Sequence, residues 1–215
     1  MLRISDVMRV VVISAATLVA VWGVSHAAPV RTEARSLGPF HAVEVAGISE
    51  AEVQVGPAQH VEVVADDQAV PHITTEVRDG RLIIGAHELE HCHTCKVRIT
   101  VPAIDALAVT GTGSITATGI ATGTLSISIS GTGGVSVSGT ADGASYQLSG
   151  TGAIDGTALA AKSASVSLNG TGDIKVRASH DVTVALGGMG SIDVYGHPKL
   201  LTKSKNGMGD IHVHD

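Results

Sequence analysis

A repeated glycine motif constrains the fold more than any other feature of this sequence. Gly-x-Gly-x-(Ile/Val) occurs six times, and the first glycines of successive copies lie 20, 19, 20, 18 and 19 residues apart. These first glycines are Gly111, Gly131, Gly150, Gly170, Gly188 and Gly207. A fixed period near 19 residues indicates a solenoid, in which each repeat forms one coil stacked on the last.

Apolar and polar side chains alternate on both sides of each glycine pair. Ile127 and Ile129 precede the second copy, and Val135 and Val137 follow it. This alternation is typical of β-strands, so each coil is predicted to contain two short strands that meet at a glycine corner. Intervening stretches such as residues 138–143 (SGTADG) are predicted to be turns.

The composition agrees with a narrow, closely packed core. Apolar residues make up 44% of the 215 residues, but the chain has only one Phe, one Trp and two Tyr. Val, Ile, Leu and Ala can fill the small interior of a single coil. The apolar fraction excludes a disordered chain, and the formal net charge of -6 excludes a basic nucleic-acid binder.

The N-terminus is predicted to be a signal peptide over residues 1–27. Arg3 and Arg9 precede an uncharged apolar run, and Ser25-His-Ala27 provides small residues for cleavage. We expect no membrane span after cleavage, because the apolar run is short for a bilayer. The alternative is an uncleaved anchor helix. After cleavage, residues 28–36 would form a short N-terminal segment, and the protein would lie in the periplasm or outside the cell.

The first half of the mature chain is predicted to be rich in strands, without the glycine motif. Alternating stretches at Val43–Val45, Val53–Val55, Val61–Val63, Leu82–Ile84 and Val97–Val101 read as five strands. They form either a small antiparallel layer or irregular first coils of the solenoid. No linker separates residues 37–102 from the repeats in 103–215, so we expect a single domain over 37–215.

The order of these features resembles a known family. Phe40-x-x-Val43-x-Val45, VRDGRLII from Val77, VRITVP from Val97 and the following Gly-Thr-Gly ladder are similar to the GIN domain, the head domain of auto-transporter adhesins. The resemblance implies a right-handed parallel β-helix in an exported protein. It implies no established activity and no catalytic motif.

One stretch carries the residues of a metal or redox site. Cys92 and Cys95 are the only cysteines, and His87, His91 and His93 surround them in what we expect to be a hairpin loop. Two thiolates and two imidazoles suit Zn²⁺, and the same soft set suits Cu(I). The competing interpretations are a disulfide between Cys92 and Cys95, which would persist after export, and a pair of free thiols.

Stacking of the repeats predicts columns of charged residues on the outer surface. The position after each motif reads Thr116, Ser136, Asp155, Lys175, Asp193 and His212. Asp155, Lys175 and Asp193 would then alternate in charge, either as a salt-bridge ladder or, with the nearby Arg177, as a patch for carbohydrate chemistry.

The last coil differs from the others in two respects. Lys203 and Lys205 stand where earlier coils have apolar residues, which predicts a polar cap over residues 201–215. His212 and His214 are predicted to share one face of a strand, either as solvated residues or as metal ligands.

These observations predict an exported, non-enzymatic β-solenoid that acts as an adhesin-like binding protein or an envelope scaffold. Its partner would be an envelope or extracellular ligand, either a glycan or a protein. We expect no catalytic residues and no obligatory cofactor. The alternatives are a periplasmic metal-binding module at the Cys/His cluster and a carbohydrate-active enzyme at Lys175 and Arg177.

Overall fold

The chain folds into a stack of β-coils. The computed structural model describes residues 29–87, 92 and 94–214. The strands of the N-terminal half are β1 (Val30–Ala34), β2 (Ala42–Val45), β3 (Ile48–Val55), β4 (His60–Asp66), β5 (Ile73–Arg78), β6 (Arg81–Ala86), β7 (Cys95–Val101) and β8 (Ala106–Val109). Those of the repeats are β9 (Thr112–Ile129), β10 (Thr132–Leu148), β11 (Thr151–Leu168), β12 (Thr171–Leu186), β13 (Met189–Tyr195), β14 (Leu200–Lys205) and β15 (Met208–His214). The described residues contain one helical segment, the short 3-10 helix η1 (Val70–His72).

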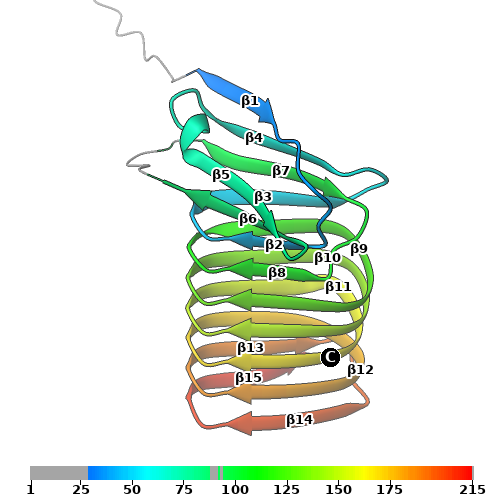
Figure 1. Cartoon of the computed structure of the whole chain (residues 1–215). Coiled ribbons are helices and arrows are strands. Elements are labelled where there is room, and N and C mark those ends of the chain that lie inside the picture. Colours follow the sequence, from blue (N-terminus) through cyan, green and yellow to red (C-terminus); the bar gives the residue numbers. More distant parts are fainter. Residues whose placement is uncertain (1–28, 88–91, 93, 215) are drawn as a thin grey trace, which may run out of the picture.

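The strands form two facing layers joined at the glycine corners and at the opposite bends (Figure 1). One layer runs β1-β4-β7-β3 and continues through the first halves of β9 to β12 to β13 and β15. The other runs β5-β6-β2-β8 and continues through the second halves of β9 to β12 to β14. Pairing between the coils is parallel, so the solenoid prediction is confirmed.

The bends of the central coils differ from the prediction. Instead of two short strands and a turn, each of β9 to β12 is one long strand that curves from one layer into the other. From β9 to β11 the backbone stays extended because pairing continues through the bend. Gly139, Thr140 and Ala141 still pair with successive residues of β11.

The second glycine of each motif lies directly above its counterpart in the next coil. Gly133, Gly152 and Gly172 are in register, and each has a φ of 141–152°, which side-chain-bearing residues rarely adopt. A Cβ atom on Gly152 would also collide with the carbonyl oxygen of Gly133. Glycine therefore permits both the corner conformation and the close stacking.

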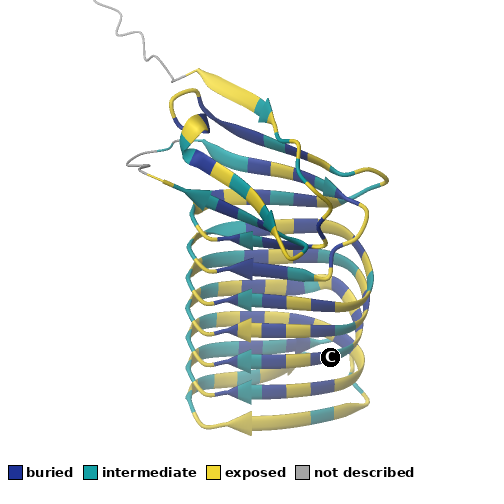
Figure 2. Ribbon diagram, in the orientation of Figure 1, coloured by how far each residue is buried: buried dark blue, intermediate teal, exposed yellow. Residues whose placement is uncertain are grey.

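The core lies between the two layers and runs through the whole stack (Figure 2). One column shows its composition: Ile127, Tyr146, Val166 and Val184 are buried and in register. Tyr146 fits into the bore because Gly156, in the next coil, has no side chain to meet its ring.

The N-terminal half combines the two arrangements that the sequence left open. All five predicted strands are present, as β2, β3, β4, β6 and β7. The pairs β6–β7, β2–β3 and β8–β9 stack in that order as three coils, which is not their order in the chain. Strands β1, β4 and β5 instead pair antiparallel around the top coil.

The last coil leaves one end of the stack open. Lys203 and Lys205 lie in register with the buried Val184 and Leu186, and both lysines are exposed. Within the described chain, β14 pairs only with β12, and β15 only with β13. Among the residues that the structure covers, no helix is long and apolar enough to span a bilayer. The predicted signal peptide lies outside those residues.

Candidate binding groove

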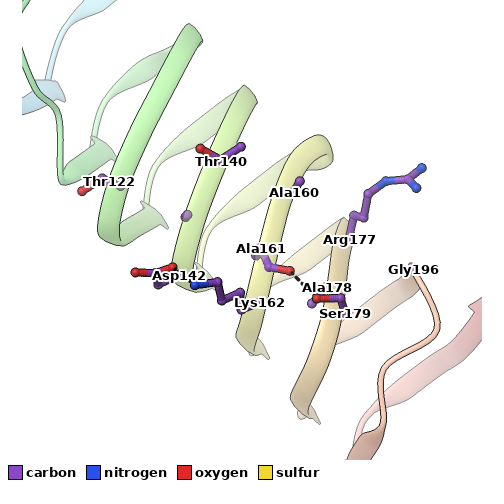
Figure 3. A pocket seen from close by; sticks show the side chains of 11 residues that line it. Thr122, Thr140, Asp142, Ala160, Ala161, Lys162, Arg177, Ala178, Ser179 and Gly196 are labelled. Atoms are coloured by element: carbon purple, nitrogen blue, oxygen red, sulfur yellow. Dashed lines mark hydrogen bonds and ion pairs between the residues drawn. The ribbon is translucent and has the colours of Figure 1, made fainter.

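A groove crosses the bends of successive coils, away from the glycine corners (Figure 3). Its volume is about 570 Å³. Ala141, Ala161 and Ala178 are buried, pair in register from β10 to β12 and line its base. Because methyl groups fill little space, the surface stays hollow along this column.

Unequal bend lengths contribute to the hollow. Asp155 of β11 pairs with Lys175 of β12, but beyond the bend Ala164 pairs with Val182. The bend of β12 is therefore two residues shorter than that of β11. A shorter bend follows a tighter path, which leaves space beside the longer one.

Polar side chains surround the groove. Lys162 Nζ lies 2.6 Å from Asp142 Oδ1, although both side chains are about two-thirds exposed, at 68% and 65%. An ion pair with this exposure adds little to stability, on the order of 0–1 kcal/mol. Thr122, Thr140 and Ser179 also line the groove and add hydroxyl groups to it.

Arg177 lines the groove and carries a guanidinium group that can recognise a ligand. Its Nε donates a 2.7 Å hydrogen bond to the carbonyl oxygen of Thr157, which fixes the start of the guanidinium. No carboxylate of the described residues pairs with this guanidinium. Its terminal amino groups therefore remain available for a ligand, and they suit a carboxylate, which can accept two parallel bonds.

The predicted charged column has the expected register but different partners. Asp155, Lys175 and Asp193 are neighbours on successive coils. Asp155 accepts hydrogen bonds from the Oγ1 and N atoms of Thr157, at 2.6 and 3.0 Å. The Thr157 hydroxyl is the main cause of the lowered pKa of Asp155, and Lys175 contributes further.

Asp193 also has a hydrogen-bond partner other than Lys175. It accepts a 2.6 Å hydrogen bond from Nε2 of His214. Since the described part of the chain shows no ion pair for Lys175, the column is not a continuous salt-bridge ladder.

The Cys/His segment is not a hairpin loop, which corrects the sequence interpretation. It connects β6 to β7, but β6 pairs with β2 and β5, whereas β7 pairs with β3 and β4. The strands on either side of the Cys/His segment therefore lie in different layers. The hairpin assumption fails because solenoid strands that follow each other in sequence belong to different layers.

Only part of the predicted metal set can be located. Cys92 and Cys95 are joined by a disulfide, with their Cα atoms 5.9 Å apart. The N–H of His87 donates to the carbonyl oxygen of His72, while His91 and His93 lie outside the described residues. A metal site at these five residues stays a prediction, and it requires reduction of the disulfide.

The sequence interpretation did not identify the groove. Asp142 and Lys162 carry opposite charges 20 residues apart, close to one repeat period, and this spacing could have located the pair. The rest of the groove has no such signal, because the composition of the bends is that of ordinary turns and their lengths vary.

Comparisons place this architecture among known proteins. A family model described as "Putative auto-transporter adhesin, head GIN domain" matches residues 39–198. A putative adhesin from Bacteroides fragilis superimposes with a TM-score of 0.73 at 20% identity, covering 87% of this chain and 98% of its own. A putative lipid binding protein from Parabacteroides distasonis gives a TM-score of 0.51 at 18% identity, covering 86% and 97%.

At these identities the solved structures show a shared fold and nothing more. No curated protein has a significantly similar sequence. The family model, however, covers well over half of the chain. The glycine ladder, the N-terminal coils and this match together show that the chain belongs to the GIN-domain family of auto-transporter adhesin heads.

Proposed function

We propose that this protein is an exported, non-enzymatic β-solenoid that binds an extended acidic glycan in the bend groove. Membership of an adhesin-like family supports a role in binding an external ligand. The stacked coils provide a long surface on which a chain-like ligand can meet equivalent positions of successive coils. The groove crosses several of these coils.

The observation that carries this proposal is the unpaired guanidinium of Arg177 beside the hydroxyl-lined groove. Sugar hydroxyls can exchange hydrogen bonds with Thr122, Thr140 and Ser179, and a sugar carboxylate can bind Arg177. The net charge of -6 repels polyanions in general. Binding of an acidic glycan would therefore have to depend on this local site.

The test compares immobilised polygalacturonate, hyaluronan and neutral dextran as probes for the mature protein. We expect binding to at least one acidic polymer, none to dextran, and weaker binding at higher salt. Arg177→Gln should weaken binding about tenfold or more, because a charge-assisted hydrogen bond is lost. Arg78→Gln is the matched control, since Arg78 is exposed, is paired with Glu76 and does not line the groove.

Unchanged binding by the Arg177→Gln variant, or equal binding to dextran, would overturn the glycan proposal. Export is tested separately, by cell fractionation and N-terminal sequencing of the full chain. We expect a mature protein that begins at Ala28, in the periplasm or at the surface. An intact N-terminus in the cytoplasm would contradict export.

The Cys/His segment supports a second, metal-binding function only if its thiols are free. The Cys92–Cys95 disulfide occupies both sulfur atoms. We expect protein isolated from the envelope to contain this disulfide and to bind metal at the segment only modestly after reduction. Stoichiometric zinc or copper in untreated protein, absent from a Cys92→Ser variant, would reverse this ranking.

An enzymatic role at Lys175 and Arg177 has less support. Asp155 is a register partner of Lys175 in the charged column, and its lowered pKa keeps it ionised and hydrogen-bonded to Thr157. Such a group is a poor proton donor at neutral pH. A sensitive assay for new reducing ends or unsaturated sugars with the same acidic polymers should detect no turnover.

A further inference from the structure

A second cluster of chemically active side chains lies at the open end of the solenoid, on the outer face of its last two coils. His212 and His214 alternate along β15, so both side chains point to the same side. Asp193 of β13 is the register partner of His212, and Tyr195 is the partner of His214. Two imidazoles and one carboxylate therefore lie on adjacent strands.

Part of this cluster is already held in place. Nε2 of His214 lies 2.6 Å from Oδ1 of Asp193, and the Asp193 side chain is only 14% exposed. The His214 ring stacks on Tyr195, with centroids 4.4 Å apart and an interplanar angle of 11°. One imidazole and one carboxylate thus have fixed positions before any ligand arrives.

His212 is the residue of this cluster whose side chain is free to change position. Its ring centroid lies 6.3 Å from that of His214, and no hydrogen bond to its ring occurs in the described part of the chain. Two imidazoles on one tetrahedral zinc ion have centroids about 5 Å apart, given Zn–N bonds of about 2.0 Å. A shift of about 1 Å by this exposed ring would reach that separation.

The described side chains do not converge on a ready metal centre in the present arrangement. The hydrogen bond between His214 and Asp193 would have to lengthen from 2.6 Å to about 3.3 Å for both atoms to bind one ion. In this change a metal ion replaces the proton that His214 and Asp193 share.

The surrounding charges do not prevent binding. On the side of Asp193 opposite His212, its register partner is Lys175 of β12. Lys175 also interacts with Asp155 and lowers the pKa of that carboxyl. Asp210, two residues before His212, is held by Lys205 at 3.0 Å. Asp193 is the carboxylate that already bonds to His214 and pairs in register with His212.

We propose that Asp193, His212 and His214 form a binding site for one divalent transition-metal ion, with water completing its coordination. Two imidazoles and a carboxylate favour Cu²⁺ and Zn²⁺ over Mg²⁺ and Ca²⁺, which prefer oxygen ligands. The site does not depend on the groove or on the Cys/His segment. Bound metal would link β13 to the edge strand β15 and stabilise the last coil.

The experiment is calorimetric titration of the oxidised mature protein with Cu²⁺, Zn²⁺ and Mg²⁺ at neutral pH. His212→Asn and Asp193→Asn are each expected to remove one equivalent of metal, or to weaken it at least tenfold. His60→Asn is the matched control. His60 also contacts a carboxylate, Glu62 at 2.8 Å, and its side chain is exposed, so its loss should leave the stoichiometry unchanged.

A second measurement separates this site from other histidines. Hydrogen exchange should slow in β15 when Cu²⁺ or Zn²⁺ is added to the wild type, and should not change in His212→Asn. Binding should also weaken as the pH falls, because protons compete with the metal for the imidazole nitrogens. Wild-type stoichiometry in His212→Asn, or equal uptake of Mg²⁺, would overturn the proposal.

Discussion

Gly152 combines two constraints, because its φ of 151° and its contact with Gly133 both exclude a side chain. We expect Gly152→Ala to lower the free energy of unfolding by at least about 2 kcal/mol, from backbone strain and overpacking. Gly134→Ala is the control, because a Cβ there meets only the Ala153 oxygen at an ordinary 3.6 Å. Urea denaturation that shows equal stabilities for the two variants would contradict this account.

Tyr146 carries a buried hydroxyl that has no hydrogen-bond partner among the described residues. Burial, and secondarily Asp155, raise the pKa of this phenol above its usual value near 10. The folded state thus disfavours the phenolate, so stability is fully present below pH 10 and declines as the pH rises further. The decline should approach about 1.4 kcal/mol per pH unit.

Replacing Tyr146 by Phe tests this prediction. At neutral pH the variant should be as stable as the wild type or slightly more stable, since an unpaired polar group is removed. Above pH 10 it should lose less stability than the wild type. Parallel alkaline denaturation curves for the two proteins would show that the phenol ionises freely in the fold.

Alternation along β12 determines which substitutions the element tolerates. Ile174 and Thr183 both lie in this strand, but Ile174 is fully buried whereas Thr183 is exposed. Ile174→Asp should cost several kcal/mol, because it places an unpaired charge in the apolar bore. Thr183→Asp should change stability by less than about 0.5 kcal/mol. Thermal melts that rank the two variants equally would refute the assignment of faces.

Strand β14 combines an unpaired edge with inward lysines, a known protection against edge-to-edge association. Lys203→Val with Lys205→Leu would restore the apolar columns of Val184 and Leu186 at the open end. We expect this double variant to self-associate with rising concentration. Lys162→Val with Lys175→Val removes the same charge from the middle of the stack and should stay dispersed in sedimentation velocity runs.

The whole molecule shows which features the sequence could predict. The repeat predicted the stacking of Gly133 on Gly152 and of Asp155 on Lys175, because each residue of a regular repeat pairs with the residue about one period away in the sequence. It could not predict the N-terminal coils, where partners come from distant segments. Cys95, for example, pairs with Ala65 and not with β6. The groove was also missed, since it depends on bend length.

Chain order in the N-terminal coils has a consequence for how the protein is made. The β2–β3 coil lies between β6–β7 and β8–β9, both of which are synthesised later. Until the start of β9 emerges, this early coil has at least one layer of unpaired backbone groups. We expect a nascent chain in this state to bind a chaperone that holds it unfolded. The N-terminal half can complete its pairing only after the first repeat has been synthesised.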